Sequence, residues 1–155
     1  MRTSAPNIIW LTEGTAEGDS TLNAFDNALL IAGIGNWNLV KVTSVAPRGA
    51  ELIHEPVEIE AGSIVPVVLS EARSNCRGEV ITACLGIGLG RDSHGMIMEH
   101  AGPGTPGDME PVVHRMVEES FARRGLELDR VVVRSVCHEV AHIGACVAAA
   151  VLWWR

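Results

Sequence analysis

The chain has 155 residues, 47% of them hydrophobic, and its 12 Lys and Arg residues against 19 Asp and Glu residues give a formal net charge of −7. This length suits one domain with a substantial core, and the negative charge disfavours nucleic acid and anionic membranes as partners while favouring a small cationic ligand. The longest apolar stretch, Ile143 to Trp154, is too short for a membrane-spanning helix, and the first residues lack the apolar segment of a secretion signal. We therefore expect one cytoplasmic domain over residues 1–155. Its four cysteines are expected to be buried free thiols: Cys76, Cys84, Cys137 and Cys146.

The first elements that we expect are a strand over Asn7–Thr12 and a helix that begins at Thr21. Asp19 or Ser20 can cap the N-terminus of this helix. Apolar residues then recur at helical spacing, at Leu22, Phe25, Leu29 and Ala32. Gly33 is expected to end the helix, because glycine readily adopts the left-handed conformation of a helix C-terminus.

Strands dominate the middle of the expected fold. Runs of β-branched and other apolar residues bounded by turn residues are typical of strands. Five such runs follow the helix: Asn38–Val45, Ala50–Ile59, Ser63–Leu69, Val80–Leu89 and Gly95–Glu99. The next segment, Ala101–Asp108, is rich in glycine and proline and is expected to be a loop.

A second helix and two strands complete the chain. The helix should bury one face, made of Val113, Met116, Val117 and Phe121. Gly125 is expected to end it directly after Arg123 and Arg124. Leu128–Cys137 and His142–Trp154 have the pattern of closing strands. Two helices and about seven or eight strands in mixed order predict an α+β layered sandwich.

Residues 138–142 read His-Glu-Val-Ala-His, the H-E-x-x-H pattern of zinc hydrolases. In those enzymes a helix places the two histidines one turn apart around the metal. Here the preceding segment is β-branched and predicts a strand, and no Glu, Asp or His follows His142 as a third ligand. We therefore expect no metal site and keep a zinc-dependent hydrolase only as an alternative.

The glycines of Gly86-Ile87-Gly88-Leu89-Gly90 do not fit the G-x-G-x-x-G dinucleotide pattern. No clear helix follows them to present its N-terminus to a phosphate. We expect a flexible strand end here and no nucleotide site.

Three features of residues 13–47 are hard to explain by packing alone. Asp26 lies in an otherwise apolar helical segment, and a glycine-flanked polar turn at residues 33–38 surrounds an isolated tryptophan. Ser44 follows Thr43 at the end of an expected strand. Each feature also has a structural explanation, namely a solvated aspartate, a helix stop and a strand end.

The run LNAFDNALLIAGIGNWNLVKVTS at residues 22–44 closely resembles the pyruvoyl-dependent arginine decarboxylases. So do Ile97-Met98-Glu99, the LELDR string at 126–130 and the GACVAAAVLWW string at 144–154. These blocks occur in the order found in the family and extend over nearly the whole chain. The resemblance implies an α+β fold of four layers, an αββα sandwich.

The resemblance implies that the protein cuts itself and makes its own cofactor. Ser44 would attack the carbonyl of Thr43, and elimination and hydrolysis would leave a β chain, residues 1–43, and an α chain, residues 44–155, that begins with a covalent pyruvoyl group (a pyruvate derived from Ser44). Backbone strain would assist this rearrangement. The family often has Ser-Ser at the cleavage pair, but the attacked group is a backbone carbonyl, so a threonine side chain should be tolerated.

The resemblance also assigns residues to the decarboxylation of L-arginine to agmatine and CO2. The pyruvoyl group would accept the electrons released with CO2. Glu99 would supply a proton, and its apolar sequence neighbours would raise its pKa by desolvation. Asp26 would bind the guanidinium group, and Asn38 would polarise a carbonyl. The remaining aligned positions line the substrate: Leu22, Gly35 and Trp37.

The separation of Asn38 and Ser44 bears on the assembly. In a straight strand, the six residue steps from Asn38 to Ser44 span about 20 Å at roughly 3.3 Å per residue. Either the chain bends there or a neighbouring subunit completes the site, and the homotrimer implied by the resemblance fits the second arrangement. An unprocessed homologue that only binds a partner or serves as a structural protein is the other function that stays open.

Overall fold

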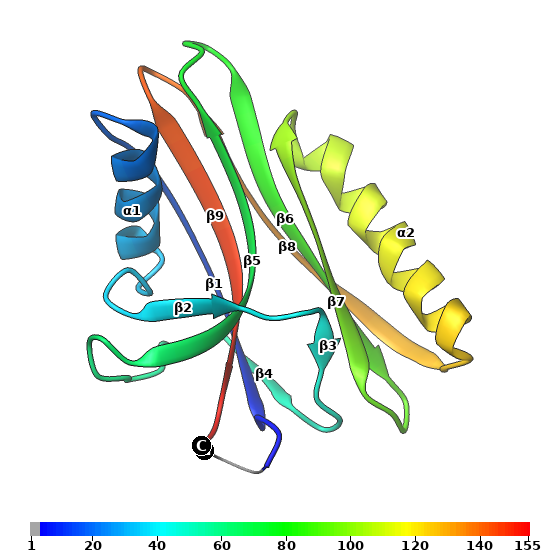
Figure 1. Ribbon diagram of the computed structural model, residues 1–155. Coiled ribbons are helices and arrows are strands. Elements are labelled where there is room, and N and C mark those ends of the chain that lie inside the picture. Colours follow the sequence, from blue (N-terminus) through cyan, green and yellow to red (C-terminus); the bar gives the residue numbers. More distant parts are fainter. Residues whose placement is uncertain (1–3) are drawn as a thin grey trace.

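The computed structural model describes residues 4–155, which fold into two stacked β-sheets and two helices (Figure 1). Sheet A has the strand order β2-β5-β9-β1-β4, and sheet B has the order β3-β7-β6-β8. The strands are β1 (Ile8–Glu17), β2 (Asn38–Lys41), β3 (Val45–Ala46), β4 (Glu51–Ile53), β5 (Ile64–Ser74), β6 (Val80–Gly90), β7 (Gly95–Pro103), β8 (Leu128–Glu139) and β9 (Gly144–Trp153). The helices are α1 (Thr21–Ile31) and α2 (Pro106–Arg124).

Each helix covers the outer face of one sheet. One hydrophobic cluster joins α1 to sheet A, a second fills the space between the sheets, and two smaller clusters join α2 to sheet B. The layers therefore follow in the order α1, sheet A, sheet B and α2, as Figure 1 shows. The predicted α+β sandwich is confirmed.

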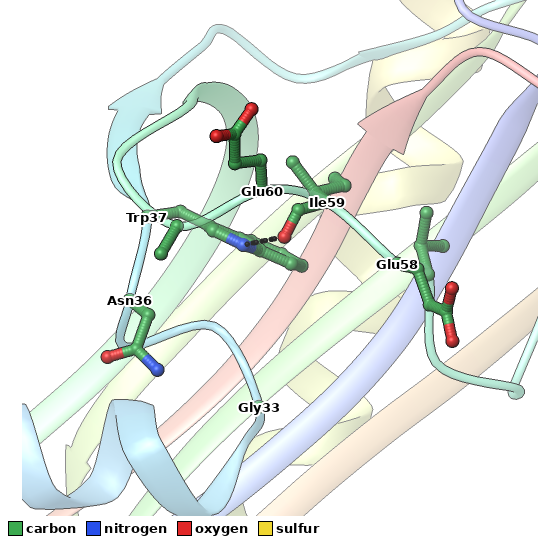
Figure 2. A pocket seen from close by; sticks show the side chains of 8 residues that line it. Gly33, Asn36, Trp37, Glu58, Ile59 and Glu60 are labelled. Atoms are coloured by element: carbon green, nitrogen blue, oxygen red, sulfur yellow. Dashed lines mark hydrogen bonds between the residues drawn. The ribbon is translucent and has the colours of Figure 1, made fainter.

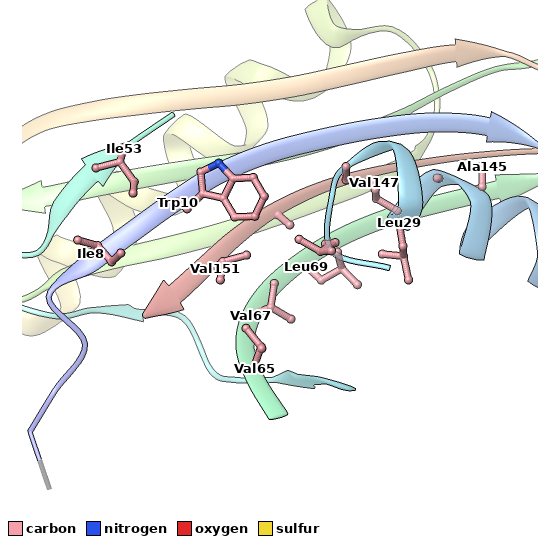
Figure 3. Close-up of a cluster of buried hydrophobic side chains, with 14 of the residues drawn as sticks. Ile8, Trp10, Leu29, Ile53, Val65, Val67, Leu69, Ala145, Val147 and Val151 are labelled. Carbon is pink, nitrogen blue, oxygen red and sulfur yellow. The ribbon is translucent and has the colours of Figure 1, made fainter. Parts of the chain in front are cut away.

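The central strand β9 is buried on both faces, which explains its nearly continuous apolar sequence. Its residues alternate between the two larger clusters. Ala145, Val147, Ala149 and Val151 pack toward α1, and Cys146, Ala148, Ala150 and Leu152 pack toward sheet B. Figure 3 shows the first cluster, in which Trp10 of β1 and Leu29 of α1 join residues of β5 and β9.

Helix α1 begins and ends where the sequence predicts. Ser20 is the N-cap, and its hydroxyl accepts from the Asn23 N–H at 3.1 Å. Gly33 follows the helix with φ of +78°, the left-handed conformation expected of it. Of the apolar residues that follow helical spacing, Leu29 and Ala32 are buried, whereas Leu22 is 66% exposed.

Three strand and loop predictions are wrong. Asn38–Val45 is divided between β2 and β3, and only Glu51–Ile53 of the expected strand 50–59 pairs in a sheet. Most of the expected loop 101–108 is regular structure, because β7 continues through the pairing of Ile81 with Pro103 and α2 begins at Pro106. The pattern of glycine and proline is explained by the capping box of α2, in which Thr105 and Asp108 bond each other, and by proline at the first helical position.

The cysteine prediction holds for two of the four residues. All four thiols are free, but only Cys84 and Cys146 are buried, whereas Cys76 and Cys137 are exposed. Burial raises the pKa of Cys84 to about 11 and that of Cys146 to about 12. No helix within residues 4–155 has both the length and the apolar character needed to cross a membrane.

Gly86 and Gly88 lie in the interior of β6, beneath α2, so the expectation of a flexible strand end is wrong. A Cβ atom on Gly88 would lie 2.4 Å from Val117 Cγ1 and 2.7 Å from the Phe121 ring. These glycines let the helix approach the strand closely.

We predict that Gly88→Ala lowers the free energy of unfolding by about 1–3 kcal/mol, the usual cost of overpacking a core. The midpoint of urea unfolding measures this at a fixed protein concentration. Gly107→Ala is the matched control, because its Cβ would meet nothing closer than Thr105 Oγ1 at 3.7 Å. The control should match the wild type, and equal stability of Gly88→Ala would contradict the packing argument.

Candidate functional site

The chain crosses from sheet A to sheet B at residues 42–44. Strand β2 runs parallel to β5, with Lys41 opposite Val67, and β3 runs antiparallel to β7, with Val45 opposite Met96 (Figure 1). The stretch between Asn38 and Ser44 is therefore bent, and the span calculated for a straight strand does not apply. Thr43 and Ser44, the predicted cleavage pair, lie in this crossing.

Both peptide groups that flank Ser44 are held by backbone hydrogen bonds. The Val45 N–H donates to the Thr43 carbonyl oxygen at 2.9 Å, and the Ile97 N–H donates to the Ser44 carbonyl oxygen at 2.7 Å. The Ser44 hydroxyl makes no hydrogen bond within the described residues. Hydrogen bonds therefore fix the backbone on both sides of Ser44, while the Ser44 hydroxyl has no partner among the described residues.

Strand β7 brings Glu99 close to this turn. Ile97 bonds Ser44, and Glu99 lies two residues further along β7, about 7 Å at roughly 3.4 Å per residue. Alternate residues share a face of a strand, and Ile97 packs between the sheets, so Glu99 lies on the inter-sheet face as well. Met96 and Met98 pack toward α2 on the other face, so they are not the desolvating neighbours that the sequence suggested.

The surroundings of Glu99 favour its protonated form. Glu99 as a whole residue is exposed in the protomer, yet burial of its carboxyl raises its pKa above the ordinary value, and the positive charge of Lys41 opposes this. In the part of the chain that the structure describes, the carboxyl makes no hydrogen bond or ion pair. A carboxyl that is unpaired and partly desolvated is suited to donate a proton.

Asp26 and Leu22 lie one turn apart on the solvent side of α1. Both are exposed, and no hydrogen bond or ion pair of the Asp26 carboxylate is found among residues 4–155. The adjacent residue, Phe25, carries the Arg73 guanidinium 4.0 Å from the centre of its ring. This flank of α1 therefore already holds one guanidinium group by a cation–π contact.

A groove of about 310 Å³ separates this flank of α1 from β2. Its lining residues are Phe25, Leu29, Trp37, Asn38, Leu39, Lys41 and Leu69. Two of the predicted site residues, Trp37 and Asn38, thus share one wall. Asp26 follows the lining residue Phe25 in sequence but is not itself among the residues that line the groove.

Trp37 and Asn38 also hold the loop that precedes β5. Figure 2 shows the Trp37 indole N–H donating to the Ile59 carbonyl oxygen, at 3.0 Å, beside a second hollow of about 530 Å³. The Asn38 side-chain amide donates to the Gly62 carbonyl oxygen at 2.7 Å. Both side chains therefore have a structural role within the protomer.

Gly35 has a steric reason to be glycine. A Cβ atom there would lie 2.8 Å from the backbone nitrogen of Leu30. The turn after α1 is too close to the helix for any side chain at this position.

Within one protomer the predicted residues form two groups. Ser44 lies in the crossing between the sheets with Glu99 on the adjacent strand β7, whereas Asp26 and Leu22 lie on the solvent side of α1. No hydrogen bond or ion pair in residues 4–155 joins the two groups.

The His138–His142 segment does not form the helix of a zinc hydrolase. His138 lies near the end of β8 and His142 in the following turn, and the Glu17 carboxylate holds them through His138 Nε2 at 2.7 Å and the His142 N–H at 2.6 Å. Burial acts to raise the pKa of Glu17, but hydrogen bonds from His138, His142 and Ala141 outweigh it, so the pKa lies below its ordinary value. Within the described residues, no group of three or more His, Cys, Asp or Glu could hold a metal ion. No sequence signal pointed to the pairing of Glu17 with this segment.

Comparisons with known proteins agree with the sequence resemblance. The family model for pyruvoyl-dependent arginine decarboxylase matches residues 8–154. The pyruvoyl-dependent arginine decarboxylase of Methanocaldococcus jannaschii is 39% identical over 152 residues, which cover 97% of this chain and 92% of the relative. The enzymes of the same name from Thermococcus kodakarensis and Thermococcus sibiricus are 40% and 45% identical, over 87% and 83% of this chain and 87% and 82% of their own lengths. The chain belongs to the pyruvoyl-dependent arginine decarboxylase family.

Proposed function

We propose that this protein decarboxylates L-arginine to agmatine and CO2 with a pyruvoyl group made from its own Ser44. Family membership supports the reaction class. The observation that carries the assignment to these residues is the crossing turn, where the free Ser44 hydroxyl lies beside an anchored Thr43 carbonyl. Glu99 lies on the strand that anchors this turn.

Cleavage between Thr43 and Ser44 is compatible with the fold. The new end at Thr43 would follow β2, which the parallel ladder with β5 holds in sheet A. The new start at residue 44 would precede β3, which pairs with β7 in sheet B. Because each end stays on its own sheet, the β chain 1–43 and the α chain 44–155 can remain one folded unit after cleavage.

The residues around Ser44 can serve a pyruvoyl group at this position. When present, the group supplies an electron sink for the electrons released with CO2. Glu99, with its raised pKa, carries the proton that the product carbon requires. Asp26 binds the guanidinium end of arginine, since a carboxylate matches a planar guanidinium with two charge-assisted hydrogen bonds.

A homotrimer would complete the site. The protomer exposes a set of large apolar side chains on α1, β2, β3 and β5: Leu22, Leu30, Ile31, Val40, Val45 and Ile64. Large exposed apolar residues gathered around a site are typical of subunit contacts. Their burial against a neighbouring protomer would bring Leu22 and Asp26 to the Ser44 and Glu99 of another subunit, and would let Asn38 polarise a carbonyl across the interface. The free thiols are consistent with a cytoplasmic location.

We predict that Ser44→Ala remains one intact chain without activity, because alanine has no hydroxyl to attack Thr43. The wild type should resolve into residues 1–43 and 44–155 in a mass spectrum under denaturing conditions. Thr43→Ala is the control and should still be cleaved, since only the backbone carbonyl of this residue takes part. Cleavage of Ser44→Ala would refute the assignment.

Glu99→Gln keeps the shape of the side chain but removes the acid. We expect complete cleavage and a decarboxylation rate reduced by about 10²–10⁴-fold, the usual contribution of a general acid. CO2 release from the processed variant measures this. Glu139→Gln, at the exposed end of β8, should retain full activity, and normal turnover by Glu99→Gln would exclude Glu99 as the proton donor.

Asp26→Asn should lower kcat/KM for arginine about ten- to a hundred-fold, because hydrogen bonds to a charged group contribute roughly 1.5–3 kcal/mol. Self-cleavage should be unchanged, since it involves no guanidinium group. The control is Asp19→Asn, which alters an exposed carboxylate just before α1. An unchanged kcat/KM for Asp26→Asn would show that this residue only solvates the helix.

A further inference from the structure

The hydrogen bond from Val45 to Thr43 closes a three-residue turn around Ser44. No residue other than glycine has a positive φ within residues 4–155, so the turn is the inverse γ-turn, with Ser44 at its centre. The acceptor of this bond is the carbonyl oxygen of the bond that the proposed reaction breaks. A backbone donor is therefore already in place on that oxygen.

The first step of the proposed cleavage makes that oxygen negative. Ser44 Oγ adds to the Thr43 carbonyl carbon, and the electron pair of the C=O bond moves to the oxygen. The C–N bond then breaks, an ester forms between Thr43 and Ser44 Oγ, and the hydroxyl proton ends on the Ser44 nitrogen. This step is an isomerisation and needs no other reactant. A hydrogen bond to an oxyanion is stronger than one to a neutral carbonyl, so a donor placed there lowers the barrier.

Strand β7 fixes the direction of this donor. The Ser44 carbonyl and the Val45 N–H belong to one trans peptide unit, which is planar. The Ile97 N–H holds the carbonyl side of this unit at 2.7 Å, so the N–H on its opposite side stays directed at Thr43. The donor is thus preorganised by the sheet and does not depend on a side-chain rotamer.

Asn38, the side chain expected to polarise a carbonyl, bonds a different carbonyl within the protomer. The Asn38 amide donates to the Gly62 carbonyl oxygen at 2.7 Å, in the loop before β5. We propose that the backbone N–H of Val45, aimed by Ile97, is the oxyanion donor for the attack of Ser44 on Thr43. This inference rests on the proposed self-cleavage and adds to it the group that stabilises its first transition state.

Val45→Pro removes this N–H, and Val45→Ala keeps it. Loss of one preorganised oxyanion donor costs about 10²–10³-fold in rate, so Val45→Pro should accumulate the intact chain while Val45→Ala is cleaved at close to the wild-type rate. The time course of fragments 1–43 and 44–155 is followed by mass spectrometry, with circular dichroism to confirm folding. Cleavage of Val45→Pro at the wild-type rate would overturn the proposal.

Proline also restricts the backbone of the preceding residue, so a second variant separates the donor from the conformation of Ser44. An ester in place of the Ser44–Val45 amide replaces only the N–H by oxygen, and it can be introduced in a synthetic segment 1–75 joined to residues 76–155 through the exposed Cys76. The semisynthetic all-amide chain is the control. Cleavage slowed by about 10²–10³-fold in the ester chain alone supports the proposal, and equal rates refute it. If the all-amide chain and the wild type both stay intact, self-cleavage itself is absent and the proposed function fails with it.

Discussion

The site depends on one constraint, the passage of the chain from one sheet to the other within residues 42–44. The ladder of β2 with β5 fixes the chain before this crossing, and the ladder of β3 with β7 fixes it afterwards. Neither strand can shift without breaking its backbone hydrogen bonds, so the peptide between Thr43 and Ser44 is held at both ends. Preorganised hydrogen-bond donors cost no rearrangement at the moment of reaction. The proposed cleavage site thus lies in a short segment whose backbone is held by a strand ladder on each side.

The same architecture explains why the residues proposed for the substrate site lie in two places on the protomer. The crossing turn and Glu99 lie at sheet B, while Asp26 lies on α1, which covers the outer face of sheet A. A groove lies between α1 and β2, and exposed apolar side chains occur on α1, β2, β3 and β5. Association of protomers through these side chains would bury them and unite the two groups of residues. In the proposed enzyme, assembly and substrate recognition thus depend on the same surface.

Patterns within short stretches of the sequence predicted several helices and strands. The Ser20 cap and the apolar spacing that follows predicted α1, and runs of β-branched and other apolar residues predicted β6, β8 and β9. The break between β2 and β3 could not be predicted, because the alternation continues through it and the partners that divide it, Val67 and Met96, are distant in sequence. The packing of Gly88 against Val117 could not be predicted either, because these two residues are also distant in sequence. The site residues came from a family resemblance, and only the structure shows that Ser44 is bonded to β7, the strand that carries Glu99.

The pKa of the proposed proton donor, Glu99, is affected by Lys41, which belongs to a network of ion pairs at the edge of sheet A. Burial raises the pKa of Glu99, whereas the Lys41 ammonium lowers it. Lys41 itself lies 3.8 Å from the Glu71 carboxylate, which also pairs with Arg73 at 2.8 Å. Burial outweighs the effect of Lys41, so the pKa of Glu99 stays above its ordinary value, as a proton donor requires. The proposed proton donor on β7 of sheet B therefore responds to a charge on β2 of sheet A, across the crossing between the two sheets.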